Sequence, residues 1–164
     1  MSSPLTTCQS DPQPRAADRF GIAYSFTLPG ESLSARIARR TVAEVLGAHG
    51  LRGEYVEDAA FVAGELVASG WRCAPGEELY LSVRYRADRL RVIVYDAHAR
   101  HVAPRLAAVC DARRRSRLRV VGALARERHG EHGFGPSQTP GGGTRTWVTL
   151  PDPQAAELAA LAAR

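Results

Sequence analysis

The stretch LYLSVRYRADRLRVIVYD, residues 79–96, carries the clearest structural signal of this 164-residue chain. Apolar and polar side chains alternate on both sides of the short segment Ala87-Asp88-Arg89. A period of two residues is typical of strands that bury one face, and a polar turn between two such runs indicates a hairpin. The sequence therefore predicts two antiparallel strands joined through this segment, the second ending at Asp96.

Outside the hairpin, the period of the apolar residues separates helices from strands. Spacings of three and four residues predict helices at 32–47, 54–70 and 118–130, and less strongly at 153–164. Alternation predicts a first strand at 20–28 and a last strand at 144–150. Two segments show neither period and are predicted to be irregular, 97–113 as an insertion or lid and 130–143 as a Gly/Pro-rich loop.

The first predicted helix has an apolar stripe and a basic side. Most of its arginines, Arg36, Arg39 and Arg40, are expected opposite the stripe. The residues expected to face the core are Leu33, Ile37, Val42, Val45 and Leu46.

The order of these elements predicts the fold class. Strands and helices in this order favour an α/β (α+β) fold, a two-layer sandwich of a mixed sheet with helices on one face. We expect one domain at residues 20–151, because the length suits a single core. Residues 1–19 are predicted to be a flexible tail, and residues 152–164 a tail or short helix.

Composition limits the possible partners and compartments. All 22 basic residues are arginine and the formal charge is +5, which suits an acidic protein, a nucleotide or a nucleic acid. Cys8, Cys73 and Cys110 show no CxxC or Cys/His metal spacing, so neither a disulfide framework nor a zinc site is expected. No apolar run approaches the ~20 residues of a membrane helix. We therefore expect a cytoplasmic protein without a membrane partner.

Four segments lie at predicted element ends in a suggestive order. They read ELVASGWRCA at 65–74, VIVYD at 92–96, RSRL at 115–118 and GGGTRTW at 141–147. With the order of helices and strands, they resemble the histidine-kinase-like ATPase superfamily, and most closely the small anti-sigma-factor serine kinases common in actinobacteria. The resemblance covers about residues 20–151 and implies a Bergerat-type ATPase fold that binds ATP and magnesium.

The first segment would supply the catalytic and metal-binding groups. Residues four apart share one helical face, so Glu65 and Ser69 can point into one cleft. The resemblance implies that Glu65 acts as general base and that position 69 holds magnesium. The family has asparagine there, and serine is a shorter ligand arm for an ion that prefers octahedral oxygen ligands. Taken alone, Glu65 is also compatible with an ordinary solvated helix carboxylate.

The other three segments would bind the nucleotide. The resemblance implies that Asp96 accepts a hydrogen bond from adenine, and that Gly141, Gly142 and Thr144 lie beside the nucleotide. Arg117 falls where the family has phosphate-cradling glycines, both missing here. Each position has a structural alternative: Asp96 suits a turn, the glycines suit a hairpin, and the arginines between 113 and 119 suit a solvated face.

Three functions remain open at this point. The family implies a transcription regulator that binds a sigma factor or an anti-sigma-factor antagonist, and the losses at Ser69 and at 115–118 favour weakened or lost ATP binding. An active ATP-dependent serine kinase is the first alternative, since phosphoryl transfer depends on positioning and charge neutralisation. A basic nucleic-acid-binding module is the second, without a recognition motif in its favour. The resemblance also allows a homodimer paired through the helix that carries Arg36.

Overall fold

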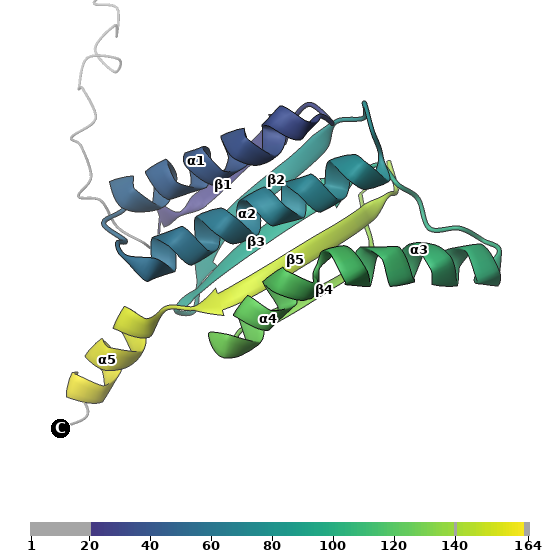
Figure 1. The fold of residues 1–164 in the computed structure, drawn as a ribbon. Helices are drawn as coiled ribbons and strands as arrows, with labels where there is room; N and C mark the ends of the chain where they lie inside the picture. Colours follow the sequence, from purple (N-terminus) through teal and green to yellow (C-terminus); the bar gives the residue numbers. More distant parts are fainter. Residues whose placement is uncertain (1–20, 140, 163–164) are drawn as a thin grey trace, which may run out of the picture.

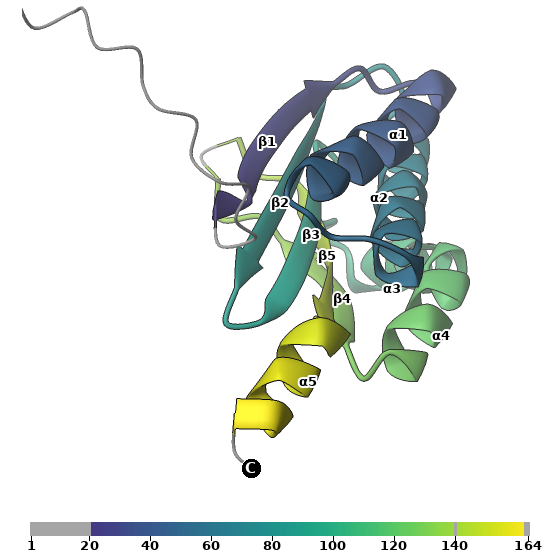
Figure 2. The same cartoon turned by 90° about the vertical axis from the view of Figure 1, so that its left-hand side faces the viewer.

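The protein forms a two-layer α+β sandwich, an open five-stranded sheet with helices on one face (Figures 1 and 2). The computed structural model describes residues 21–139 and 141–162. The sheet order is β1-β2-β3-β5-β4. Its strands are β1 (Ala23–Leu28), β2 (Leu79–Arg86), β3 (Arg89–Asp96), β4 (Glu131–Pro136) and β5 (Thr144–Pro151). The helices are α1 (Ser32–Ala48), α2 (Glu54–Cys73), α3 (Pro104–Arg117), α4 (Arg119–Glu127) and α5 (Pro153–Ala162).

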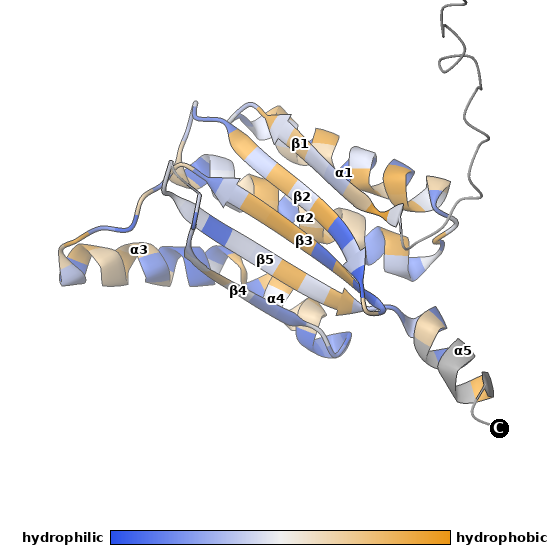
Figure 3. Ribbon diagram, turned by 180° about the vertical axis from the view of Figure 1, so that it is seen from behind, coloured by the Kyte–Doolittle hydropathy of each residue, from blue (hydrophilic) through white to orange (hydrophobic). Residues whose placement is uncertain are grey.

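The core lies between the sheet and the helices α1, α2 and α4. The predicted hairpin is confirmed as β2 and β3, with Ala87 and Asp88 at positive φ in its two-residue turn. Positive φ at both positions matches the twist of the flanking strands. The predicted helix at 54–70 is confirmed as α2, which continues to Cys73. Seen from behind, the opposite face of the sheet has none of the described helices over it (Figure 3).

The sheet is antiparallel where a mixed sheet was expected. All four strand pairings among the described residues are antiparallel. β3 and β4 run in the same direction, but β5 lies between them because it pairs with both. The connection through α3 and α4 therefore leads to an edge strand, and the β4–β5 hairpin fills the place beside β3.

The prediction of an irregular segment at 97–113 was wrong over most of its length, because α3 begins at Pro104. Proline suits the first turn of a helix, and the alanines and arginines that follow are strong helix formers. The apolar period failed because α3 buries a single side chain, that of Arg114. This helix extends beyond the sheet (Figure 1) and is attached by an ion pair instead of an apolar stripe.

The predicted loop at 130–143 contains the edge strand β4. Its glycines conceal the strand period but have a packing function. A Cβ at Gly133 would lie 2.6 Å from the Trp147 ring, so the missing side chain makes room for the indole on β5. Glycine in a strand often marks such a close approach.

The buried stripe of α1 differs from the predicted one. Leu33 and Ile37 are 43% and 41% exposed. The buried residues repeat every four positions and are Ser34, Ala38, Val42 and Leu46. The first two of these are small because this part of α1 packs closely on α2, where a Cβ at Gly64 would lie 3.3 Å from the Ala35 carbonyl oxygen.

The C-terminal helix is attached at Asp152, where a short helix was one of two expectations. The Asp152 carboxylate accepts hydrogen bonds from the Tyr85 hydroxyl at 2.7 Å and from the Gln154 N–H at 2.9 Å. A carboxylate at this position caps the start of α5. Phe20 and the tail predicted at 1–19 lie outside the described residues.

Candidate functional site

The end of β3 holds a buried ion pair. Asp96 Oδ2 accepts a hydrogen bond from Arg114 Nη1 at 2.7 Å, and Oδ1 accepts one from Arg114 Nη2 at 3.2 Å. The same guanidinium donates to Thr146 Oγ1 at 3.1 Å, and the His98 backbone N–H donates to Asp96 Oδ1 at 3.1 Å. The side chains of Arg114 and Asp96 are 5% and 0% exposed. The geometry is that of a bidentate arginine–carboxylate pair.

This pair closes the expected adenine position. Asp96 lies at the predicted strand end, but both of its carboxylate oxygens are engaged within the protein and neither reaches solvent. A nucleobase would have to displace Arg114, and removing one partner of a buried pair costs about 3–5 kcal/mol. As folded, the residues present do not fit adenine.

The expected magnesium position is also closed. Ser69 is 2% exposed, and its Oγ is buried without a hydrogen-bond partner. Glu65, one turn earlier on α2, is half-buried. Neither residue lines the arginine-rich cavity beside α3 and α4. Because magnesium requires several oxygen ligands and usually keeps water, one sealed hydroxyl does not fit this ion.

A cavity of about 1240 Å³ opens between the loop after β3, the helices α3 and α4, and the strand β4. Among the described residues, eight arginines line it, together with a single carboxylate from Asp111. The lining also includes Arg117 and Thr144 from the predicted site. With arginines so much in excess, the cavity favours an anionic ligand or an acidic segment of a partner.

Arg117 and Thr144 both contact protein groups at the edge of this cavity. Arg117 Nη1 donates to Cys73 Sγ at 3.1 Å, and Thr144 Oγ1 donates to the His98 carbonyl oxygen at 2.7 Å. Burial raises the pKa of the Cys73 thiol, while the nearby guanidinium groups of Arg114 and Arg117 act in the opposite direction. The Cys73 thiol is thereby kept protonated and weakly nucleophilic.

The three consecutive glycines have different roles. Gly141 and Gly142 have open space around them and do not line the cavity. Gly143 has φ +89, and a Cβ there would overlap the Asp96 carbonyl oxygen. Gly142 also has a positive φ, of +70, but only Gly143 of the three combines it with close packing against the end of β3, so the strictest requirement for glycine lies at Gly143, which the sequence did not single out.

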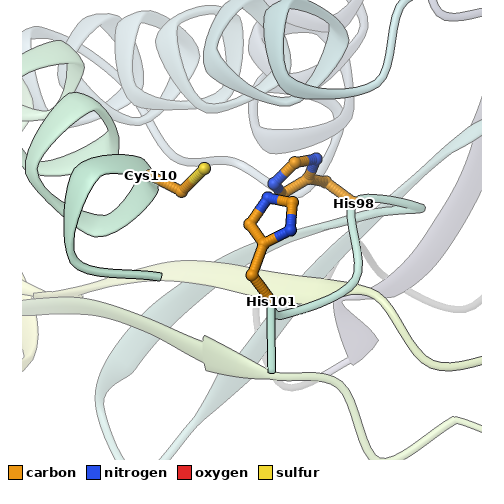
Figure 4. A group of neighbouring side chains, drawn as sticks. All are labelled: His98, His101 and Cys110. Carbon is orange, nitrogen blue, oxygen red and sulfur yellow. The ribbon is translucent and has the colours of Figure 1, made fainter. Parts of the chain in front are cut away.

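A group that the sequence analysis missed lies at the same cavity. The side chains of His98, His101 and Cys110 come together there (Figure 4). The sequence signal was the spacing H-x₂-H-x₈-C, which matches no common metal motif. The residues meet because the loop after β3 bends back against α3, and local spacing does not reveal such a bend.

Comparisons with known proteins leave the family open. No protein-family model matches the chain, and no curated protein matches it. The family resemblance therefore stays a prediction. Within residues 21–139 and 141–162, none of the helices combines the length and the apolar character needed to cross a membrane.

Proposed function

We propose that this protein is a regulator that acts by binding a partner protein in the cytoplasm and does not turn over ATP. The observation that carries the proposal is the buried pair between Asp96 and Arg114. It closes the one position where the family would recognise adenine. The partner implied by the resemblance is a sigma factor or an anti-sigma-factor antagonist, so the protein would control transcription by sequestration.

The phosphate-handling region supports the absence of catalysis. Residues 115–117 belong to the last turn of α3, where the family has a glycine-rich phosphate loop. Backbone N–H groups inside a helix are already bonded to the preceding turn and cannot cradle a phosphate. Phosphoryl transfer depends on phosphate positioning and on magnesium, and neither the helical residues 115–117 nor the buried Ser69 suits these tasks.

The surface around α3 supports partner binding. This helix and its flanks expose apolar side chains next to the arginines of the cavity, with Leu106 48%, Val109 47% and Val120 61% exposed. Arginine beside exposed aliphatic groups is a common composition for protein interfaces. The excess of positive charge favours a partner with an acidic docking segment.

The first experiment is calorimetry of the purified chain with ATP, with and without magnesium. We expect no binding at millimolar ATP. A micromolar Kd that is lost in Asp96→Asn but kept in Asp88→Asn, an exposed turn residue, would overturn the proposal.

The second experiment measures binding to the sigma factors and antagonist proteins of the same cell, one at a time. Arg113→Glu with Arg117→Glu should weaken a true complex at least about tenfold, since like charges across an interface repel. Arg52→Glu, an exposed arginine outside the cavity, is the matched control. If no such protein binds, or if both variants weaken binding equally, the proposed partner surface is wrong.

Nucleotide binding remains the second candidate function, because the arginine-lined cavity suits phosphate groups. In that case ATP would bind with its phosphates among Arg113, Arg115 and Arg117, and an active kinase would release ADP in the presence of the antagonist. A nucleic acid would use the same arginines. It would be recognised by a steep fall of affinity with salt.

A further inference from the structure

His98, His101 and Cys110 form a compact group of metal-ligating atoms (Figure 4). Each residue presents one ligand atom, and all three atoms lie within 4.8 Å of one another. His98 and His101 come from the loop after β3, and Cys110 from α3. In a tetrahedral zinc site, bonds of about 2.0–2.3 Å place neighbouring ligand atoms about 3.3–3.6 Å apart. Closing the group around an ion therefore requires a shift of about 1 Å.

The backbone around the group is already ordered by hydrogen bonds. The His98 N–H donates to Asp96 Oδ1 at 3.1 Å, and its carbonyl oxygen accepts from Thr144 Oγ1 at 2.7 Å. Arg100 Nη2 lies 3.7 Å from Asp111 Oδ2, which links the loop to α3 next to Cys110. The first two contacts fix the loop that carries the histidines to the ends of β3 and β5, while the Arg100–Asp111 pair and the buried pair between Arg114 and Asp96 connect this region with α3. Metal binding would therefore cost little chain entropy.

The three side chains are half-buried and are free of competing partners among the residues that the structure describes. In the described part of the chain, none of them makes a side-chain hydrogen bond or ion pair. The two imidazole rings meet edge-to-face, with centroids 5.0 Å apart and planes at 74°. Half-buried imidazoles usually engage their nitrogens with a protein or solvent partner. Here those nitrogens face a second imidazole and a thiol, which is a suitable set for a borderline-soft cation.

We propose that His98, His101 and Cys110 bind a divalent ion of the zinc class, Zn²⁺ in the first place. Two imidazoles and one thiolate are nitrogen and sulfur ligands of the kind zinc takes, whereas magnesium and calcium prefer oxygen. Binding releases the thiol proton of Cys110 to solvent, so the bound unit carries a net charge of +1. The inference rests on these residues alone and does not depend on the proposed function.

Three protein ligands leave one tetrahedral coordination position open, and the residues that line the cavity determine which ligand can occupy it. All three residues line the arginine-rich cavity, so the open position faces that space. Water fills it in the free protein, and an anionic group that reaches the cavity can replace the water. The metal and the arginines would then hold the same phosphate or carboxylate. The arginines oppose a bare cation, so the thiolate of Cys110 is needed for tight binding.

The test is direct metal binding to the full chain carrying Cys8→Ser and Cys73→Ser, in which Cys110 is the only cysteine. Calorimetry with Zn²⁺ should give one site with a Kd of about 1 µM or below. Co²⁺ should give intense visible bands of tetrahedral geometry and a thiolate-to-cobalt charge-transfer band in the near ultraviolet. Inorganic phosphate, added to the cobalt form, should change the visible bands.

Variants decide whether these three residues are the ligands. His98→Ala, His101→Ala and Cys110→Ser should each weaken zinc binding at least about 100-fold, since even outer-shell partners are worth 10–100-fold. His132→Ala is the matched control, because His132 lines the same cavity outside the group. Circular dichroism confirms that each variant is folded. Zinc binding weaker than about 100 µM, a cobalt spectrum without the charge-transfer band, or equal losses in His132→Ala would each overturn the proposal.

Discussion

Replacement of Arg114 by methionine tests the feature on which most of the site depends. The side chain of Arg114 is 5% exposed and is the only one that α3 buries. Arg114→Met keeps the apolar stem and removes both hydrogen bonds to Asp96 and the one to Thr146. The Asp96 carboxylate then stays buried with the His98 N–H as its remaining donor.

The expected loss follows from this geometry. Breaking a buried ion pair by removing one partner costs about 3–5 kcal/mol, and the remaining donor places the value near the lower end, about 3 kcal/mol. For a chain of this size each kcal/mol corresponds to about 2–4 °C, so Tm should fall by about 6–12 °C. Because no apolar stripe attaches α3, trypsin should also cleave within this arginine-rich helix faster than in the parent chain.

Urea denaturation, with the midpoint and the m-value fitted together, gives the free energy of unfolding. Arg113→Met is the matched control, since the neighbouring arginine is exposed and its loss should change stability by less than about 0.5 kcal/mol. The double variant Asp96→Asn with Arg114→Met should lose less than the sum of the single variants, because the pair is coupled. A loss below about 1 kcal/mol in Arg114→Met, or additive losses, would refute the buried pair.

Three further predictions concern single positions. Ser34→Ala should lower the free energy of unfolding by about 1 kcal/mol, because the Ser34 hydroxyl donates to the Pro29 carbonyl oxygen at 2.6 Å. Ser69→Ala should be neutral or slightly stabilising, because the Ser69 Oγ has no hydrogen-bond partner. Urea denaturation measures both, and a large loss in Ser69→Ala would contradict the closed position. Gly143→Ala should lower the free energy of unfolding by at least about 2 kcal/mol, and Gly141→Ala by less than about 0.5 kcal/mol. Of these two positions, only Gly143 combines a positive φ with contact to the Asp96 backbone. Equal losses in the two variants would contradict this packing. Alkylation of Cys73, measured against pH in a chain carrying Cys8→Ser and Cys110→Ser, should be slow at neutral pH and rise only above the usual pKa range of a thiol. Arg117→Ala should slow it further, because the guanidinium lowers that pKa, and faster alkylation in this variant would contradict the contact.

Local patterns predicted the elements that bury an apolar face. The β2–β3 hairpin and α2 each have a continuous buried side, so their periods are visible in the sequence. The patterns failed where an element is attached by an ion pair or by close packing at glycine and small residues, and not by a continuous apolar face. α3 is attached by one arginine, the edge strand β4 has Gly133 against Trp147, and the first two inward residues of α1 are the small Ser34 and Ala38.

The candidate site divides in the same way. The sequence placed Asp96 and Thr144 at the ends of β3 and β5, where they lie paired in register. It did not reveal that Arg114, 18 residues later and on α3, reaches Asp96, and this contact decides whether the carboxylate is open to a ligand. His98 and His101 are distant from Cys110 in the sequence, whereas the three side chains meet in the structure.

By itself, the sequence determined the layered α+β architecture, the hairpin at its centre and the excess of positive charge, because periodicity and composition are local properties. The tertiary structure alone decided that Asp96 is sealed, that Ser69 is buried without a partner, and that two histidines and a cysteine share one cavity wall. The sealing of Asp96 and the grouping of the histidines with the cysteine both depend on where α3 lies against the end of β3, and the burial of Ser69 depends on how α2 packs in the core. These contacts join side chains from different elements, so no local pattern in the sequence reveals them.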